Sequence, residues 1–397
     1  MTDTEAYPTP RAIPGQWIVR LKAFASEGTK TQHLSSVSSR SADATSFNVE
    51  VHHEFDLDEA RGYSASFDEA TKKQLEQLAE VASVEPVLLY DHCAISSVTS
   101  GGVPWGLARL SSDGKGVVAY VLDTGINEKH VQFEGRATKG PMFVTPPDPS
   151  IVTSNDDEQG HGTHCAGTIG SKDYGVAKKV DIVGIKVFND LRRDHDERAG
   201  AQNADIMAAI EYVVQEFKEH GKPSVINLSL GGPPYEPLDA TVSAAVRAGV
   251  LVVCAAGNAP ADNLAPRDAD TTSPARTPLA ITVAASDVND RIASFSNYGK
   301  RKGSLADGNM QWRDTKTDST WIGRNNNETE TISGTSMACP HVVGVAATIL
   351  SNPKMANKTP FDVASQLLLL ADKNRITGLD GKKQRTIDAV PQVLLQV

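Results

Sequence analysis

The chain has 397 residues, of which 40% are hydrophobic and 22% are charged, an ordinary balance for a globular protein. A chain of this length can bury a large core and is expected to form two or more domains. The formal net charge of −10 argues against a nucleic-acid partner, because phosphate contacts need a basic surface, and no apolar run reaches the ~20 residues that span a bilayer. We expect a monomer that binds neither nucleic acid nor membrane.

The first fifteen residues are polar and proline-rich, so no secretory signal segment is visible in them. The four cysteines are Cys93, Cys165, Cys254 and Cys339. Their spacing does not match a zinc site, and small buried cysteines are common in proteins. We therefore predict four free, buried thiols.

The N-terminal part predicts a small α+β module. Strands are expected at 16–21, 47–55, 63–67 and 81–90, one helix between the first two strands, and a second helix at 68–80 with Asp68 as its N-cap. This β-α-β-β-α-β order is that of ferredoxin-like domains. Residues 91–103 are rich in Ser, Thr and Gly and predict a linker, so the second domain begins near Pro104.

The second domain predicts an α/β fold with a doubly wound, mostly parallel sheet. Continuous apolar, β-branched runs occur at 117–122, 181–187, 225–230, 250–255 and 280–284, and helical patterns lie between them at 203–220 and 239–248. Ligands of such folds bind at the carboxyl ends of the strands. Asp123 and Asn258 each follow such a strand end, which places both at the expected site.

The stretch 331–341, Thr-Ile-Ser-Gly-Thr-Ser-Met-Ala-Cys-Pro-His, places Ser336 at the start of a helix without a polar face, Met337 to Leu350. Such a helix should be buried, and its N-terminus favours negative charge through free N–H groups and the helix dipole. A serine hydroxyl there suits acyl transfer, provided that a base and an orienting group lie near it. His161, in Gly-His-Gly-Thr-His-Cys-Ala-Gly, and Asp123, in Ala-Tyr-Val-Leu-Asp-Thr-Gly, are the candidates.

Asp, His and Ser follow one another in the order known for subtilisin. The chain resembles the subtilisin-like serine peptidases, family S8, over most of residues 11 to 397. The motifs Pro-Trp-Gly-Leu-Ala-Arg at 104–109 and Ser-Phe-Ser-Asn-Tyr-Gly at 294–299 are most similar to the proteinase K branch from fungi. We assign Ser336 as nucleophile, His161 as general base and then acid, and Asp123 as the carboxylate that orients the imidazole.

The resemblance also implies the residues that bind the substrate. In Ala-Ala-Gly-Asn at 255–258, Asn258 should donate to the developing oxyanion together with the backbone N–H of Ser336. Ser229, Leu230 and Gly231 should form one wall of the pocket for the residue before the cleaved bond, and Ala256 and Gly257 the other. Residues 199–201 are a candidate for the opposing edge strand, with a solvated loop as the alternative.

The domain plan implied by the resemblance has three parts: an inhibitor I9-like propeptide at 11–92, a linker with the maturation site at 93–103, and the catalytic domain at 104–397. The expected function is a serine endopeptidase that works through an acyl-enzyme, prefers apolar or aromatic residues before the cleaved bond, and is made as a self-inhibited zymogen. Its partners would be protein substrates and its own propeptide. The family implies a secreted or vacuolar location.

The chain departs from the family pattern at Lys300 to Asp318. This stretch is polar and lacks a β pattern where the family has a short apolar strand bearing an Asp. We therefore expect a sheet strand to be missing, which makes an inactive pseudoprotease the alternative function. The same Asp would bind calcium with the carbonyls of Pro278 and Ala280. We expect no required cofactor, and structural calcium stays an open alternative.

A metal hydrolase is the third hypothesis, because Asp156 or Asp157, His161 and His164 are spaced closely enough to form a metal cluster. Neither an HExxH helix nor a cysteine pair accompanies them. We expect no metal at these residues. His164 and His341 are instead expected to be buried and hydrogen-bonded.

Overall fold

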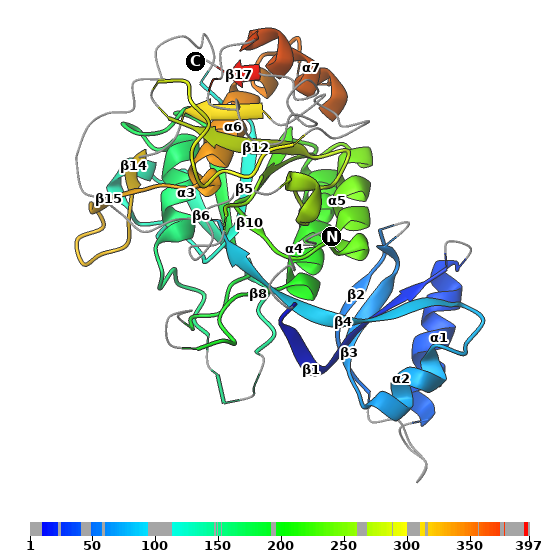
Figure 1. Ribbon diagram of the computed structural model, residues 1–397. Helices are drawn as coiled ribbons and strands as arrows, with labels where there is room; N and C mark the ends of the chain where they lie inside the picture. Colours follow the sequence, from blue (N-terminus) through cyan, green and yellow to red (C-terminus); the bar gives the residue numbers. More distant parts are fainter. Residues whose placement is uncertain are drawn as a thin grey trace, which may run out of the picture.

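The structure is a computed structural model in which the N-terminal module and a larger α/β domain are joined by a long strand (Figure 1). It describes residues 10–22, 25–40, 49–57, 60–93, 113–146, 148, 150–151, 153–191, 196–259, 268–287, 289–299, 310–313, 317–355, 357–373, 377 and 393–395. Within these ranges no helix is long and apolar enough to span a membrane. All four cysteines are free and buried, as the sequence predicts.

The N-terminal module has the predicted ferredoxin-like order. Its elements are β1 (Ala12–Leu21), α1 (Glu27–Arg40), β2 (Glu50–Phe55), β3 (Gly62–Ser66), α2 (Glu69–Leu75) and β4 (Val81–His92), and the antiparallel sheet has the order β4-β1-β3-β2. Asp68 caps α2 by accepting the Thr71 N–H at 2.7 Å. This helix ends at Leu75, before the predicted residue 80, because turns follow it.

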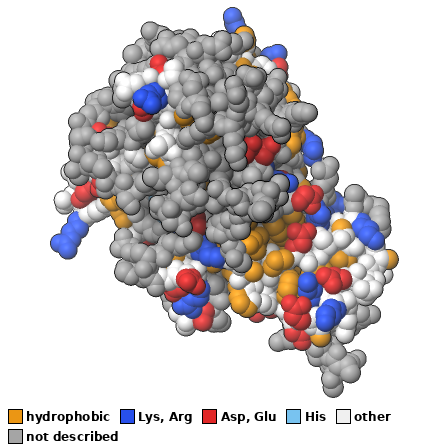
Figure 2. All heavy atoms as spheres, in the orientation of Figure 1, with side chains coloured by type: hydrophobic (Ala, Val, Ile, Leu, Met, Phe, Trp, Pro, Cys, Tyr) orange, Lys and Arg blue, Asp and Glu red, His pale blue; other side chains and the backbone are white. Residues whose placement is uncertain are grey.

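The two faces of this small sheet are buried against different partners. On β1, Trp17, Val19 and Leu21 belong to the module's own core, whereas Ile18 belongs to a core shared with the larger domain. This follows from the alternation of side chains along a strand. The module is therefore packed on the larger domain through one sheet face. The view in Figure 2 shows charges of both signs over the module and hydrophobic side chains where it adjoins the larger domain.

The larger domain is a doubly wound α/β domain, as predicted. Its nine-stranded sheet has the order β16-β17-β13-β12-β11-β9-β5-β7-β6, and all neighbours are parallel except β16 and β17. The strands are β5 (Val118–Asp123), β6 (Ala137–Met142), β7 (Asp181–Lys186), β9 (Ser224–Leu228), β11 (Leu251–Ala255), β12 (Ile281–Ser286), β13 (Met310–Arg313), β16 (Ala371–Lys373) and β17 (Val393–Leu395). Short strands outside it are β8 (Ala201–Gln202), β10 (Leu230–Gly231), β14 (Thr317–Thr320) and β15 (Thr329–Ile332).

Helices cover both faces of this sheet (Figure 1). They are α3 (His161–Gly170), α4 (Asn203–His220), α5 (Glu236–Arg247), α6 (Thr335–Leu350) and α7 (Pro360–Leu370). One core contains residues of α3, α6 and α7, and the other contains residues of α4 and α5. Helix α6 is buried at every residue except Ile349, as its lack of a polar face predicts. Each large apolar side chain buried in this way contributes ~1.5–3 kcal/mol.

The expectation that a sheet strand is missing near residues 300–318 is wrong. Strand β13 lies beside β12 in parallel register, with Val283 opposite Met310 and Ser286 opposite Arg313, and it pairs with β17 on its other side. The stretch Met-Gln-Trp-Arg lacks an apolar run because tertiary pairing, not local pattern, determines its conformation. Residues 300–309 and 314–316 lie outside the described residues. The ground for the pseudoprotease alternative is thereby removed.

Candidate active site

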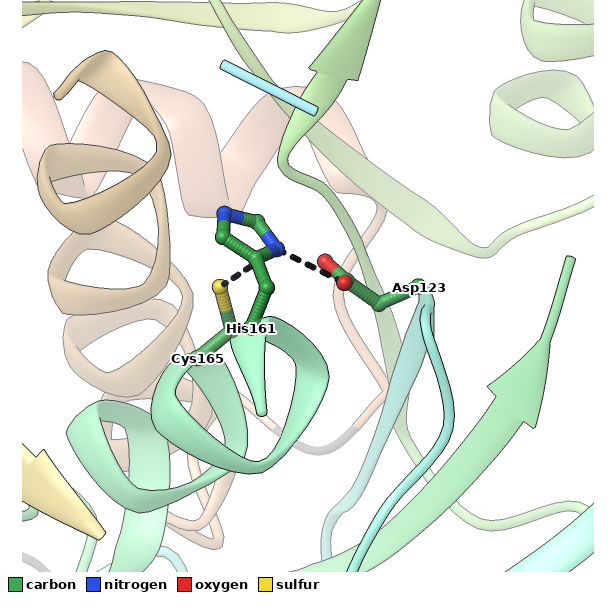
Figure 3. A group of neighbouring side chains, drawn as sticks. All are labelled: Asp123, His161 and Cys165. Atoms are coloured by element: carbon green, nitrogen blue, oxygen red, sulfur yellow. Dashed lines mark hydrogen bonds and ion pairs between the residues drawn. The ribbon is translucent and has the colours of Figure 1, made fainter. Parts of the chain in front are cut away.

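Asp123 and His161 form a buried pair at the carboxyl edge of the sheet (Figure 3). Asp123 ends β5 and His161 begins α3, and the distance from Asp123 Oδ1 to His161 Nδ1 is 2.7 Å. The Thr124 N–H donates to the same Oδ1, also at 2.7 Å. Gly162 allows this approach, because a Cβ there would lie 2.1 Å from the Gly125 carbonyl oxygen.

Sequence reasoning missed Lys186, whose side chain is fully buried at the end of β7. Its ammonium group donates to the carbonyl oxygens of Thr124 (2.5 Å) and Asp156 (3.0 Å) and pairs with Asp190 at 2.7 Å. These contacts fix the turn that follows Asp123. A buried charge needs a partner. A lysine at the end of an apolar strand run is therefore a sequence signal for a buried charge with a specific partner.

Ser336 is fully buried at the second position of α6. Its hydroxyl donates to the Ser229 carbonyl oxygen at 2.9 Å, and the Ser229 hydroxyl donates in return to the Ser336 carbonyl oxygen at 2.9 Å. His161 Nε2 is buried and has no hydrogen-bond partner among the described residues. The serine and histidine are thus not hydrogen-bonded to each other in this state, and the nitrogen that would act as base is free.

Cys165 lies beside His161, further along α3 (Figure 3). Its Sγ is 4.0 Å from His161 Nδ1 and donates to the Ser336 carbonyl oxygen at 3.6 Å, so it touches both the histidine and the serine segment. Ligand atoms of Asp123, His161 and Cys165 lie within 4.8 Å of one another. Burial raises the pKa of the Cys165 thiol well above its ordinary value, so the thiol stays protonated and fits a packing role better than metal ligation.

The end of the N-terminal module lies between two strands of the larger domain. Strand β4 pairs antiparallel with β10, Leu230 opposite His92 and Gly231 opposite Asp91. On its other edge it pairs with β8, Tyr90 opposite Ala201 and Leu89 opposite Gln202. The predicted linker 91–103 thus begins later than expected, because strand pairing continues through His92. The opposing edge strand is 201–202, and only the last residue of the predicted 199–201 takes part.

The carbonyl oxygen of Cys93, at the end of this tail, accepts two hydrogen bonds. Asn258 Nδ2 donates at 2.7 Å and the Ser336 backbone N–H donates at 3.1 Å. Asn258 is held in this orientation because its Oδ1 accepts from the N–H (3.1 Å) and hydroxyl (3.0 Å) of Thr335. The Cys93 N–H donates to the Ser229 carbonyl oxygen at 3.1 Å. The two predicted oxyanion donors thus meet on one carbonyl oxygen.

The remaining predicted pocket residues lie near this carbonyl. Ser229 to Gly231 contact the tail along one side, through the Ser229 carbonyl and the β10 pairing. Ala256 and Gly257 follow β11 and immediately precede Asn258, and Gly257 has a positive φ of 89° that favours glycine. Their role as the second wall stays a prediction.

The residues of the metal hydrolase hypothesis have other partners. Asp156 pairs with Lys139, and Asp157 accepts hydrogen bonds from the side chains of Thr124 and Thr163. His164 Nε2 donates to the carbonyl oxygens of Thr317 (3.0 Å) and Glu330 (3.2 Å), and burial lowers the pKa of His164 to about 3. His341 Nδ1 donates to the Met337 carbonyl oxygen at 2.8 Å. Both histidines are buried and hydrogen-bonded, as expected.

Comparison with known families agrees with this geometry. Residues 114–383 match the model of the subtilase family, peptidase S8, and residues 16–89 match that of peptidase inhibitor I9. The chain belongs to the subtilase family. It is a subtilisin-like serine protease that carries an I9 inhibitor propeptide.

Fungal subtilases are similar to it over nearly the whole chain. Subtilisin-like proteinase Mp1 of Magnaporthiopsis poae is 36% identical over 94% of this chain and 90% of that protein. Alkaline protease 1 of Aspergillus clavatus is 33% identical over 96% and 92%, respectively. The crystal structure of a cold adapted subtilisin-like serine proteinase aligns with a TM-score of 0.60 and 34% identity, covering 75% of this chain and 98% of that one. These relatives confirm the resemblance to the proteinase K-like branch.

Proposed function

We propose that this subtilase is an endopeptidase that uses Asp123, His161 and Ser336 as its catalytic residues and Asn258 as an oxyanion donor. We propose further that its own N-terminal module holds it as a self-inhibited zymogen. One observation carries both statements: the Cys93 carbonyl oxygen is bound by the Asn258 amide and the Ser336 N–H, which is how a substrate carbonyl would be bound.

The reaction follows from these contacts. His161 Nε2 takes the proton of the Ser336 hydroxyl as Oγ bonds to the substrate carbonyl carbon, and Asp123 stabilises the imidazolium through Nδ1. His161 then gives that proton to the amine as the carbon–nitrogen bond breaks, which leaves an acyl-enzyme. Water, deprotonated by His161, hydrolyses the ester and restores the Ser336 hydroxyl. Before attack, the Ser336 hydroxyl must leave the Ser229 carbonyl oxygen and turn to His161 Nε2.

The steps above are supplied by side chains and backbone N–H groups, so we propose that no cofactor is required. Structural calcium at the carbonyls of Pro278 and Ala280 stays an alternative. The carboxylate that the family supplies from the neighbouring strand is not found on β13, whose sequence is Met-Gln-Trp-Arg. Residues 300–309, before β13, lie outside the described part of the chain.

The inhibited state is supported by contacts at several points besides the tail. Arg11 donates to the carbonyl oxygens of Glu197 (2.7 Å) and Ala199 (2.8 Å), beside the edge strand β8. His53 Nε2 donates to Asp205 Oδ1 at 2.7 Å, where α4 begins. The N-terminal module therefore binds residues beside the substrate cleft, and its tail occupies the cleft itself. We keep the boundaries 11–92, 93–103 and 104–397 as the proposed propeptide, linker and catalytic domain.

We expect the chain to cut itself between Cys93 and Ala94, because the Cys93 carbonyl lies between the oxyanion donors. This is the first bond of the stretch 93–103 in which the sequence predicts maturation. Purified wild-type protein should yield a fragment that begins at Ala94, whereas Ser336→Ala protein should stay full length. N-terminal sequencing and intact mass of both proteins measure this.

The control for this experiment is Ser365→Ala, which removes an exposed hydroxyl on α7 that donates to the Phe361 carbonyl oxygen. It should be processed like wild type. Wild-type protein that stays uncut and still hydrolyses peptides at full rate would show that the N-terminal module is not an inhibitory propeptide. A cut Ser336→Ala protein would show that another protease does the cutting.

The association of the cleaved module should depend on pH through Glu211 of α4. Both Glu211 carboxylate oxygens accept the Asp56 N–H, at 2.8 and 3.0 Å. Burial raises the pKa of Glu211 from 4.5 to about 7; the Asp56 N–H, Lys30 and Lys218 oppose the rise and the Asp56 carboxylate adds to it. Between these pH values Glu211 is protonated while the cleaved module is bound and loses its proton when the module separates. The affinity of the module for the larger domain should therefore fall as pH rises from about 4.5 to about 7.

Glu211→Gln should remove this dependence, because the amide keeps an acceptor for the Asp56 N–H without a titrating charge. The onset of peptidase activity after self-cleavage, recorded between pH 4.5 and 8, reports release of the module. The release rate of wild type divided by that of the Glu211→Gln variant should rise as the pH rises from about 4.5 to about 7. A ratio that is constant with pH would contradict the assignment.

A further inference from the structure

We propose that Asp157 is a positioning residue of this protease, whose carboxylate joins the turn after Asp123 to the start of the helix that carries His161. The proposal rests on the proposed function, because it takes Asp123 and His161 as the catalytic pair. Asp157 is also one of the residues of the metal hydrolase hypothesis, but donors of the chain itself bind both of its carboxylate oxygens. Those donors determine what the residue can do.

The Asp157 side chain is buried, with 7% of the residue exposed, and each of its oxygens accepts more than one hydrogen bond. Oδ1 accepts the Thr124 hydroxyl and the Gly160 N–H, each at 2.8 Å, and the Gln159 N–H at 3.1 Å. Oδ2 accepts the N–H and the hydroxyl of Thr163, at 2.9 and 2.6 Å. Hydrogen bonds to a charged acceptor are roughly twice as strong as neutral ones, so these contacts fix the carboxylate firmly.

The hydrogen bonds of this network reach both members of the catalytic pair (Figure 3). Thr124 directly follows Asp123, and its hydroxyl accepts the Gly162 N–H at 2.9 Å while it donates to Asp157. Gly162 directly follows His161, where α3 begins. Asp157 therefore connects the end of β5 to the start of α3, the two elements that bring Asp123 Oδ1 to 2.7 Å from His161 Nδ1.

The turn after Asp123 is held at two atoms of Thr124. Lys186 donates to the Thr124 carbonyl oxygen and keeps the turn beside the end of β7. Asp157 accepts from the Thr124 hydroxyl and also from the Gly160 N–H at the cap of α3. Without this carboxylate α3 could shift relative to β5. A displacement of about 1 Å at a reacting group can cost roughly a hundredfold in rate.

The first test is Asp157→Asn, in enzyme whose N-terminal tail has been cut by an added protease that is then removed. The amide keeps the size of the side chain but puts an NH2 group where donors of the chain now bind an oxygen. We expect kcat, expressed per active site titrated with a serine-directed reagent, to fall about ten- to a hundredfold. KM should stay within about twofold, because the groups that bind the tail in the cleft, Ser229, β10 and Asn258, are unchanged.

The matched control for this variant is Asp156→Asn. It removes one negative charge from the neighbouring residue, whose carboxylate is exposed and pairs with Lys139. Its kcat per active site should stay within about twofold of wild type, since surface ion pairs contribute little. A difference between the two variants therefore measures the hydrogen bonds of Asp157 and not the loss of a charge.

Two substitutions at Thr124 test the connection by a second route. Thr124→Val has nearly the same shape but lacks the hydroxyl between Asp157 and Gly162, so its kcat per active site should fall about tenfold. Thr124→Ser keeps the hydroxyl and should stay within about threefold of wild type. Asp157→Asn combined with Thr124→Val should lose little more than Asp157→Asn alone, because both substitutions break the same link.

Two results would overturn the proposal and leave the catalytic residues in place. Equal kcat per active site in Asp157→Asn and Asp156→Asn would show that Asp157 only stabilises the fold. A Thr124→Ser enzyme as slow as Thr124→Val would show that the hydroxyl is not the link, and this pair decides the question also if Asp157→Asn yields no folded protein. Hydrolysis by Ser336→Ala at the wild-type rate would instead overturn the proposed function, so the two failures are distinguishable.

Discussion

Replacing Ser336 by alanine should lower peptide hydrolysis by about a millionfold, the magnitude measured for the equivalent loss in subtilisin, a member of the same family. The variant has no nucleophile, while the Asp123–His161 pair and the oxyanion donors remain. His161→Ala should lose nearly as much, because the serine and its base act as one unit. Turnover of a chromogenic peptide, measured after the N-terminal tail has been cut by an added protease and that protease removed, isolates the chemical step.

Stability provides the control for these variants. Removing one hydroxyl from a residue at the start of α6 leaves the apolar packing of that helix in place, so thermal unfolding of Ser336→Ala should match wild type within a few degrees when both have had the N-terminal tail cut. Hydrolysis by Ser336→Ala at more than about a hundredth of the wild-type rate would show that a different group attacks the substrate.

Asn258→Ala should lower kcat by about 10²–10³-fold, which is again the value known for subtilisin. The loss arises in the transition state, because the Asn258 amide donates to the oxygen on which charge develops, and KM should change little. Comparing kcat with KM on one peptide measures this separation.

The variant Asn258→Asp separates the loss of the hydrogen-bond donor from a disturbance of the loop. The aspartate keeps an oxygen that can accept from Thr335, so the loop should stay in place, but it cannot donate and it adds a negative charge beside the oxyanion. Its kcat should therefore be lower than that of the alanine variant. If both variants turned over like wild type, the carbonyl held by Asn258 would not be the reacting one.

The sequence predicts the fold and the candidate residues where local signals are strong. Asp123, His161 and Ser336 each lie in a long motif, and the apolar runs of the central strands reflect burial on both faces. The structure brings Asp123 and His161 into contact and places Ser336 and Asn258 on the same carbonyl.

Other features depend on contacts between distant segments and could not be read from local pattern. Strand β13 lacks an apolar run and is fixed as a strand by its pairing with β12 on one side and β17 on the other. The tail residues Asp91 and His92 resemble a linker in composition, yet they pair with β10. The position of Lys186 at the end of an apolar strand run indicates a buried charge, but the carbonyl oxygens and the Asp190 carboxylate that surround it are known only from the structure. In each case long-range pairing overrides the local signal.

The most direct test of the account is to label the self-processed enzyme with a serine-directed phosphonyl reagent and to locate the label by peptide mass mapping. The account predicts one label per molecule, on Ser336, with loss of hydrolysis in proportion to labelling, and no label in Ser336→Ala or His161→Ala whose N-terminal tail has been cut by an added protease. A label on a different serine that abolishes hydrolysis, or full hydrolysis by protein labelled at Ser336, would contradict it.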